Sequence, residues 1–463
     1  MIKLVSGKRY KMEVTLLLIL VTILLCWMIS VIRKKYNYCK DRGIPHSFPI
    51  FPLGNFWGVG LTLPFIDMIN ATYRKFKGSD VICGLFLFTK CCFIVLDVDL
   101  IKNILVKDFY SFHDRGLYHN EVSDPLSAHL FSTKGEQWKT VRAKMTTTFS
   151  SGKIKSMMPL LTKISQDFVD VIGESADNKQ VVDYRDAASR YMCDIIGLVA
   201  FGLECNSLRI NDSKILKLSN FLNFTDWNQR FRFIFANAYQ DLSRKIGFQV
   251  TSHELQDFFL TVVSETVEYR EKNNIERNDF LQLLIQLKNN GKLDGDSQFI
   301  GKISFTDLAA QCFVFFLAGF ETSSTALSYA LYELAINPEL QERTRKEIEK
   351  VLEQHNGEMS YDAIMNMDFV GQVIDESLRR YTPGNVLVRE CTKEYKVPNS
   401  NHVIEKGMMV LLPMHAIHND PEFFPNPEKF DPDRHSPEQV KQRNPFTFLP
   451  FGKQFIKYLM KYF

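Results

Sequence analysis

Nineteen consecutive residues near the start of the chain, from Val14 to Ile32, carry no charged side chain. Leucine, isoleucine and valine dominate the run, and a helix of this length, rising about 1.5 Å per residue, roughly spans the hydrocarbon core of a bilayer. A cleaved signal peptide is the alternative, but the run is long for its apolar region and no small-residue cleavage pattern follows Ile32. We therefore expect an uncleaved transmembrane helix.

Positive charge is concentrated around this run. Residues 1–42 contain nine lysines and arginines against Glu13 and Asp41, a net charge of +7, whereas the other 421 residues carry −4. The basic residues 33–35 directly after the run favour a cytosolic body, although basic residues before it compete for the same side. The orientation is clearer if translation starts at Met12. Charge confined to one end argues against a body that binds nucleic acid.

Residues 37–55 separate the apolar run from the rest of the chain. The segment from Gly43 to Gly54 contains Pro45, Pro49 and Pro52. Each proline removes a backbone donor and restricts the residue before it, so this segment cannot be helical. We expect residues 1–36 to form a membrane anchor with a basic flank, and residues 37–55 to form a stiff hinge.

The cysteines do not form a disulfide framework or a structural zinc site. There are nine, an odd number, and they are scattered without a C-x-x-C pair, which is typical of a reducing compartment. None follows Cys391. His415 and His418 have no nearby glutamate or cysteine that would complete a metal site, so no protein-bound metal site is predicted from them.

The remaining residues predict a helix-rich body. Apolar, β-branched and aromatic runs at 81–88 and 92–96 predict a small β-hairpin. From Leu100 onward the apolar spacing is mostly helical, notably at 191–202, 254–271 and 279–288. With 45% hydrophobic and 24% charged residues, the chain can bury a large core.

The longest body helix is expected from Ser304, which can form a capping box with Asp307, to Asn337 before Pro338. Residues 308–320 are apolar on every face, so this helix should cross a protein core. The polar segment 318–324 in its middle suggests a task, and Gly319 leaves space for a ligand. Alternatively, the hydroxyls bond back to the preceding turn and Glu321 reaches the surface.

Two further pairs are ambiguous by themselves. Glu376 and Arg379 lie one above the other on a helix face, a spacing that usually marks a solvated pair. Trp138 and Arg142 lie one helical turn apart and could hold a carboxylate or phosphate. Neither pair is specific alone.

Together and in this order, these features resemble the membrane-bound cytochromes P450 of the insect microsomal type, which are haem-thiolate monooxygenases. The resemblance extends from the anchor to Gly452 and includes further landmarks: Phe112-His-Asp-Arg-Gly116, Asp124-Pro-Leu-Ser-Ala-His129, Asp194-Ile-Ile-Gly197, Phe430-Asp-Pro-Asp-Arg434 and Phe448-Leu-Pro-Phe-Gly452. It implies a mainly α, prism-shaped single domain with a small β lobe, spanning residues 56–452, after the transmembrane helix.

The resemblance also implies roles for polar residues around a haem cofactor. The haem propionates would be bound by three side chains with hydrogen-bond donors: Trp138, Arg142 and Arg389. A buried ion cluster behind the haem, in which two arginines compensate one carboxylate, would consist of Glu376, Arg379 and Arg434. Proton delivery during oxygen activation would use Glu321 and Thr322, beside Gly319.

By the same resemblance, the partners are O2, a lipophilic small molecule and an NADPH-dependent reductase. The substrate would be a xenobiotic or an endogenous lipid or hormone, and the protein would lie in the endoplasmic reticulum membrane with a cytosolic body. The substrate pocket would be lined by apolar side chains: Phe313, Phe316, Leu317, Phe320 and Leu387.

The chain departs from the family pattern after Gly452. The family continues into a glycine-rich loop that carries the axial cysteine, but residues 453–463 here are a divergent tail with Tyr458 at the cysteine position. The thiolate pushes electron density towards iron, so its loss removes the chemistry as well as the ligand. A tyrosinate can ligate haem, as in catalases, but Tyr458 lacks the glycine-shaped loop.

Two functional classes therefore remain open. One is a monooxygenase whose sequence is truncated or altered at its end, so that this chain is inactive. The other is a non-catalytic, membrane-anchored remnant or isoform that binds lipophilic ligands or redox partners.

Deleting residues 1–36 should move the protein from the carbonate-resistant membrane fraction towards the soluble fraction, because the deletion removes the uncharged run. Fractionation and immunoblotting of the full-length and deleted chains would measure this. An unchanged distribution would contradict a single anchor.

Overall fold

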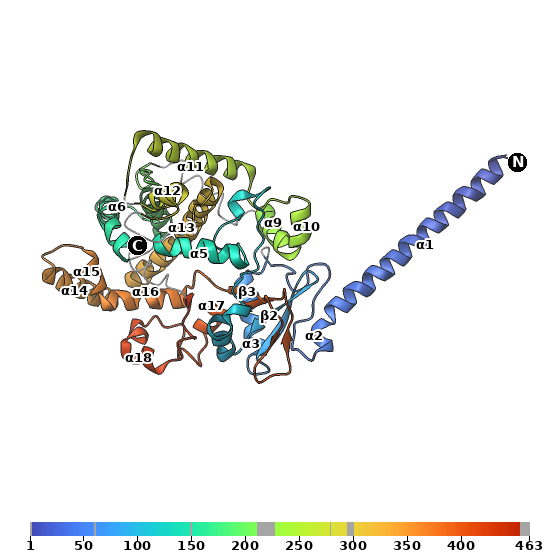
Figure 1. Ribbon diagram of the computed structural model, residues 1–463. Coiled ribbons are helices and arrows are strands. Elements are labelled where there is room, and N and C mark those ends of the chain that lie inside the picture. The colour runs from blue at the N-terminus through green and yellow to red at the C-terminus, as the bar shows by residue number, and fades with distance from the viewer. Residues whose placement is uncertain are drawn as a thin grey trace.

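A computed structural model describes residues 2–59, 62–148, 151–210, 227–277, 279–293 and 301–453. A small sheet lies near the point where the N-terminal helix joins the body, and most of the helices lie beyond it (Figure 1). The structure thus confirms the predicted mainly α fold with a small β part and an N-terminal apolar helix.

The helices are listed here in chain order: α1 (Ile2–Tyr36), α2 (Tyr38–Asp41), α3 (Phe65–Phe76), α4 (Val98–Lys102), α5 (Gly135–Thr148), α6 (Ser151–Asp177), α7 (Tyr184–Ile196), α9 (Trp227–Ala238), α10 (Gln240–Lys245), α11 (His253–Asn273), α12 (Phe280–Asn290), α13 (Phe305–Ile336), α14 (Pro338–Gln354), α15 (Tyr361–Met365), α16 (Asp368–Arg380), α17 (Met414–His418) and α18 (Pro437–Gln442). Short 3₁₀ or π turns are η1 (Asn103–Lys107), η2 (Phe109–Ser111), η3 (Pro125–Ser127), η4 (Gly197–Phe201) and η5 (Pro432–His435).

Six of the seven strands in the described residues form one four-stranded sheet and one two-stranded sheet, and β7 belongs to neither. The strands are β1 (Ile82–Leu87), β2 (Lys90–Val95), β3 (Leu387–Glu390), β4 (Tyr395–Lys396), β5 (Val403–Ile404), β6 (Met409–Leu412) and β7 (Pro450–Lys453). The larger sheet has the order β1-β2-β6-β3. The antiparallel pair β1 and β2 is the predicted hairpin, whereas β2 pairs with β6 in parallel.

Helix α1 projects away from the body (Figure 1). An 18-residue window within its stretch Thr15–Tyr36 has a mean hydropathy of 2.8 and is not buried. Among the described residues it is the one helical stretch that is long and apolar enough to cross a bilayer, judged by length and composition.

The proline-containing segment after α2 lies alongside β1 and is not helical, as predicted. The amide of Gly84 donates to the carbonyl of Pro45 (2.7 Å), and the amide of Asn55 donates to Phe86 (2.8 Å). Gly54 has a φ of +68°, and a Cβ there would lie 2.3 Å from the Phe86 carbonyl oxygen. Only glycine fits this close approach, so the segment is packed on the sheet. Its role as a hinge stays a prediction.

Helix α13 runs through the helical part of the body, in contact with α7, α11, α12 and α16. Its N-terminus has the predicted capping box, in which Ser304 and Asp307 bond reciprocally. Residues 308–313 are buried, as expected for a helix that crosses a core. This helix and the larger sheet are the two centres of the buried apolar residues.

Candidate functional site

Three of the predicted site residues carry hydrogen-bond donors and lie between the helices and the sheet. Trp138 and Arg142 lie one turn apart on α5, with the guanidinium carbon 5.9 Å from the centre of an indole ring. Arg389 comes from β3. Nε1 of Trp138 and Nε of Arg389 are both buried without a hydrogen-bond partner. Buried donors of this kind require an acceptor.

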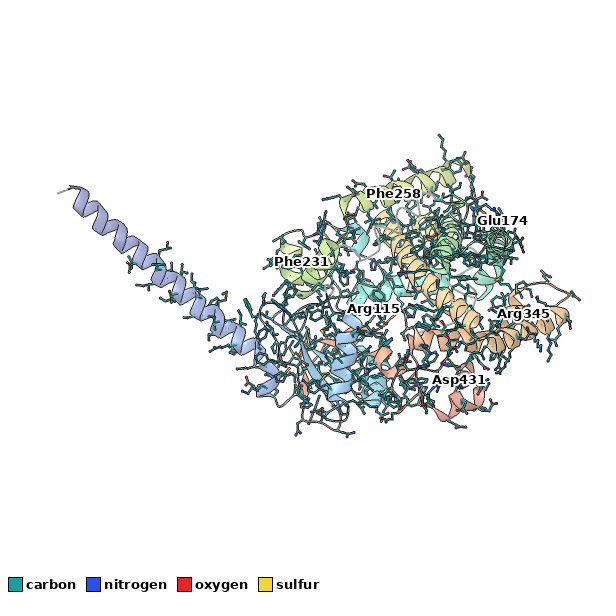
Figure 2. The ribbon with its side chains drawn as sticks, turned by 180° about the vertical axis from the view of Figure 1, so that it is seen from behind. Arg115, Glu174, Phe231, Phe258, Arg345 and Asp431 are labelled. Carbon is teal, nitrogen blue, oxygen red and sulfur yellow. The ribbon has the colours of Figure 1, made fainter. Side chains whose placement is uncertain are left out.

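A third guanidinium group, that of Arg115, belongs to the same cluster. Burial, and then the nearby charges of Arg389 and Arg142, lower the pKa of Arg115 to about 9. Burial and Arg142 likewise lower the pKa of Arg389 to about 10. Figure 2 shows Arg115 in the middle of the body. The sequence singled out the segment 112–116 as a landmark but gave Arg115 no role.

Buried like charges are unfavourable unless an anion lies between them. In the described part of the chain, none of the three arginines forms an ion pair with a carboxylate. The cluster of Arg115, Trp138, Arg142 and Arg389, which we call the guanidinium cluster, therefore fits a ligand that presents carboxylates. The two propionates of haem have this chemistry, so the residues present fit this end of the cofactor.

Two hydrogen bonds place the guanidinium cluster beside α13. Nη1 of Arg115 donates to the carbonyl of Leu130 (3.3 Å), and the amide of Leu130 donates to Oε1 of Gln311 on α13 (3.0 Å). Gln311 is 2% exposed, and its Nε2 has no partner. The guanidinium cluster and the central helix thus meet at Leu130.

The acid and hydroxyl of α13 are arranged as in the second of the two alternatives drawn from the sequence. The hydroxyl of Thr322 donates to the carbonyl of Ala318 in the preceding turn (2.5 Å). The side chain of Glu321 is 49% exposed and lies 3.4 Å from Arg185. The two side chains therefore make contacts on different parts of the helix surface.

Gly319 does not leave the expected space for a ligand. A Cβ at this position would lie 3.0 Å from Cδ1 of Ile196, so the glycine permits close packing of α13 on α7. Ala318, the neighbouring residue, is exposed. Within the described chain, the face of α13 at Ala318 is therefore the less covered one.

The five residues predicted to line a substrate pocket do not gather at one place. Phe313 and Phe316 pack on Phe259 of α11, with ring centres 5.4 Å and 6.4 Å apart, and Phe320 stacks on Phe316. These three rings belong to the core of the helical part. Leu317 is half-buried beside that core, whereas Leu387 on β3 packs against the sheet core.

Glu376 and Arg379 form a buried ion pair. Both side chains are 0% exposed, and the guanidinium donates to the carboxylate through Nε (2.8 Å) and Nη2 (3.0 Å). Arg379 also donates to the carbonyls of His418 (2.8 Å) and Pro427 (2.7 Å). The geometry thus excludes the alternative of a solvated surface pair.

The third partner of Glu376 is a residue that the sequence did not single out. Nε2 of His435 lies 3.0 Å from Oε2, and the amide of Asp431 donates to Oε1 (3.0 Å). Arg434, the expected third member, also forms an ion pair with Glu376, with Nε 3.5 Å from Oε1, and its Nη2 donates to the carbonyl of Asn426. The sequence signal that could have identified it is that His435 directly follows the predicted Arg434.

Burial acts to raise the pKa of Glu376, but the hydrogen bonds from His435 and Arg379 outweigh it, and the pKa is lowered below 4.5. The carboxylate is therefore held ionised. The cluster of Glu376, Arg379 and His435 joins α16 to η5. Asp431, the residue directly before η5, is labelled in Figure 2.

The predicted axial position falls outside the described residues, since Tyr458 lies beyond Lys453. The strand that leads to it is held by His418: Nε2 of the buried imidazole accepts from the amide of Leu449 (3.1 Å), while Nδ1 contacts the hydroxyl of Thr382 (2.9 Å). Among the described residues, no group of three or more His, Cys, Asp or Glu side chains could hold a metal ion.

The described cysteines nearest in sequence to that strand lie in other environments. The thiol of Cys391 donates to the carbonyl of Lys393 (2.7 Å), and burial raises its pKa to about 11. Burial also raises the pKa of Cys312, which lies in the core of the helical part. Both thiols are therefore held protonated.

Comparison with known proteins gives a consistent result. The family model for cytochrome P450 matches residues 46–453. Cytochrome P450 6A1 of Musca domestica is 44% identical over 425 residues, covering 91% of this chain and 83% of that protein. Cytochrome P450 6a9 and probable cytochrome P450 6a13 of Drosophila melanogaster are each 40% identical, covering 95% of this chain and 87% of each relative.

Replacing Glu376 by alanine should lower the free energy of unfolding by about 3 to 5 kcal/mol, because Arg379 is left buried without a counter-charge. As a control, Glu342→Ala removes an exposed pair with the same i, i+3 spacing to Arg345 and should cost less than about 1 kcal/mol. Urea unfolding and protease resistance would measure both. Equal losses would contradict the burial of Glu376.

The same substitution should have a defined pH dependence. Since the pKa of Glu376 is lowered by folding, its stabilisation is complete above about pH 4.5 and declines as the pH falls through the lowered folded pKa. The difference in stability between wild type and Glu376→Ala should therefore shrink below pH 4.5. A difference that grows on acidification would contradict this.

Proposed function

Since this chain belongs to the cytochrome P450 family, and is thus of a class of haem-dependent monooxygenases, we propose that its site is built to insert one oxygen atom of O2 into lipophilic small molecules. The observation that carries the proposal is the guanidinium cluster. One buried and two half-buried arginines converge with an indole donor and form no ion pair with a protein carboxylate among the described residues, which suits a dianionic cofactor edge.

When bound, haem supplies the oxygen-activating chemistry. The chain's own contribution begins with position: Arg115, Arg142 and Arg389 would fix the carboxylate edge, and Trp138 would add a donor from Nε1. Because α5 belongs to the helical part and β3 to the larger sheet, these residues would also connect the two parts through the cofactor. The less covered face of α13 at Ala318 would face the reacting centre.

We assign proton delivery to Thr322 and Glu321. The Thr322 hydroxyl donates a hydrogen bond to the Ala318 carbonyl, so its oxygen can still accept a hydrogen bond from another donor. Glu321 is paired with Arg185 at the surface and would have to leave that contact to pass a proton to Thr322. Both side chains would therefore have to change partners for the relay to work. Gly319 would support it by bringing α13 close to α7.

The buried cluster of Glu376, Arg379 and His435, with Arg434 at its edge, would act as a rigid frame behind the cofactor. Arg379 binds the carbonyl of His418, and the imidazole of His418 holds Leu449 at the start of the strand that leads to the axial position. The frame would thereby fix the direction of that strand.

The environment and partners follow from the family and from α1. We propose that residues 1–36 anchor the protein in the endoplasmic reticulum membrane with residues 56–452 in the cytosol, connected by a hinge at residues 37–55. The substrate would be a xenobiotic or an endogenous lipid, and an NADPH-dependent reductase would supply electrons. The apolar composition of α13, with Leu317 beside its less covered face, supports a lipophilic substrate.

We also propose that a polypeptide made of these 463 residues alone does not complete the reaction. No cysteine follows Cys391, and Cys391 and Cys312 are engaged elsewhere as protonated thiols. Without a thiolate, the chain would at most be a membrane-anchored binder of lipophilic ligands or redox partners. This second candidate is supported by the guanidinium cluster, whose residues all precede Gly452 and would still fit the cofactor without the cysteine loop.

The reduced, carbon monoxide-treated chain should lack the Soret band of thiolate-ligated haem, because it offers no axial thiolate. A repaired variant with the family's cysteine loop and following helix after Gly452 should gain the band. Tyr458→Cys alone should not, since the loop glycines and arginine are still absent. A thiolate band from the unmodified chain would overturn this part of the proposal.

In the repaired variant, Arg389→Ala should lower the haem-to-protein ratio several-fold, because it removes a buried partner of the propionates. Arg345→Ala, at an exposed position on α14, is the control and should leave the ratio unchanged. Haem content from the pyridine haemochrome spectrum, with folded protein measured separately, would test this. An unchanged ratio for Arg389→Ala would contradict the role of the guanidinium cluster.

A further inference from the structure

Two cysteine thiols touch at the junction between the membrane anchor and the sheet. The sulfur atoms of Cys39 and Cys91 are 3.3 Å apart, and both residues are free cysteines. Cys39 lies on α2, directly after the apolar helix, and Cys91 lies near the start of β2. Their exposed fractions are 0% and 9%. None of the residues assigned to the haem site lies in this region.

The backbone holds the two sulfurs together. The amide of Ile44 donates to the carbonyl of Cys39 (2.9 Å), which fixes α2 against the proline-containing segment that lies alongside β1. A Cβ at Gly84 would lie 2.3 Å from the Cys39 sulfur, so a glycine at this position of β1 makes room for the thiol. Each partner thus sits on an element anchored to the same sheet.

We propose that Cys39 and Cys91 are a redox-sensitive pair that forms a reversible disulfide when the protein meets hydrogen peroxide. The Cys39 thiolate would attack the peroxide, giving a sulfenic acid and releasing water after proton uptake. The Cys91 sulfur would then displace the sulfenic hydroxyl, which leaves as a second water with the thiol proton. Two thiols are oxidised by two electrons, and one peroxide is reduced to two waters.

The surroundings favour Cys39 as the attacking sulfur. The contact with the Cys91 sulfur lowers the pKa of Cys39 against the effect of burial, and the guanidinium of Arg42 adds to the lowering. Burial instead raises the pKa of Cys83 and of Cys92 to about 12 each. Since the thiolate is the nucleophile, these two neighbours should react more slowly.

A bond between Cys39 and Cys91 would have a mechanical consequence. It would close a loop that contains the whole segment from α2 to β2, including α3 and β1. The short helix α2 would then be tied covalently to the sheet, so the angle between anchor and body would be restricted. In a reducing compartment the link would be opened again by cellular thiols.

The test uses the full-length chain in phospholipid vesicles, treated with increasing hydrogen peroxide. Remaining thiols are alkylated before and after reduction with two reagents of different mass, and peptides are identified by mass spectrometry. A link between the peptides containing Cys39 and Cys91 should appear before any other and should disappear on reduction. Because Cys91 and Cys92 share a tryptic peptide, Cys92→Ser must keep the link and Cys91→Ser must abolish it.

Other outcomes would overturn the proposal. These are stable sulfinic acid at Cys39 without a link, no reaction of either thiol, or earlier linkage of Cys193 to Cys205, which also interact. Hydrogen exchange supplies the second measurement: amides of residues 38–44 should exchange several-fold more slowly in oxidised than in reduced wild type. The same difference in Cys91→Ser, or none in wild type, would refute the link or its effect on α2.

Discussion

The ion pair between Glu376 and Arg379 is the interaction on which the arrangement of the site depends. A carboxylate with 0% exposure is costly to bury, and here it is satisfied by one arginine, one histidine and one backbone amide. The arginine also donates to the carbonyl of His418 at the end of α17 and to that of Pro427 in the loop after it. Residues from α16 to the start of β7 are therefore fixed relative to one another by a few directional bonds.

The guanidinium cluster presents the opposite case. Its cations lie near one another, with Arg389 buried and Arg115 and Arg142 half-buried, and within the described residues no carboxylate pairs with them. One charge cluster is neutralised within the protein, whereas among the described residues no protein carboxylate pairs with the other. The first is suited to hold a frame, and we propose that the second recognises a cofactor.

The sequence predicted the regular elements well because local patterns determine them. The hairpin at β1 and β2, the capping box at Ser304 and the apolar core stretch of α13 depend on neighbouring residues. The site was less predictable because it depends on burial. The spacing of Glu376 and Arg379 is identical to that of Glu342 and Arg345, yet only the first pair is buried. Three-dimensional packing separates them, and it also brings Arg115 and His435 into place.

The order of the strands has a consequence for how the protein is made. Strand β2 pairs in parallel with β6, which follows about 300 residues later in the chain. At a synthesis rate of roughly 5 to 20 residues per second, the ribosome takes about 15 to 60 seconds to cover that distance. Through this interval the edge of β2 that pairs with β6 lacks its partner strand. The nascent chain thus depends on the translation of its last quarter to close a sheet begun in its first.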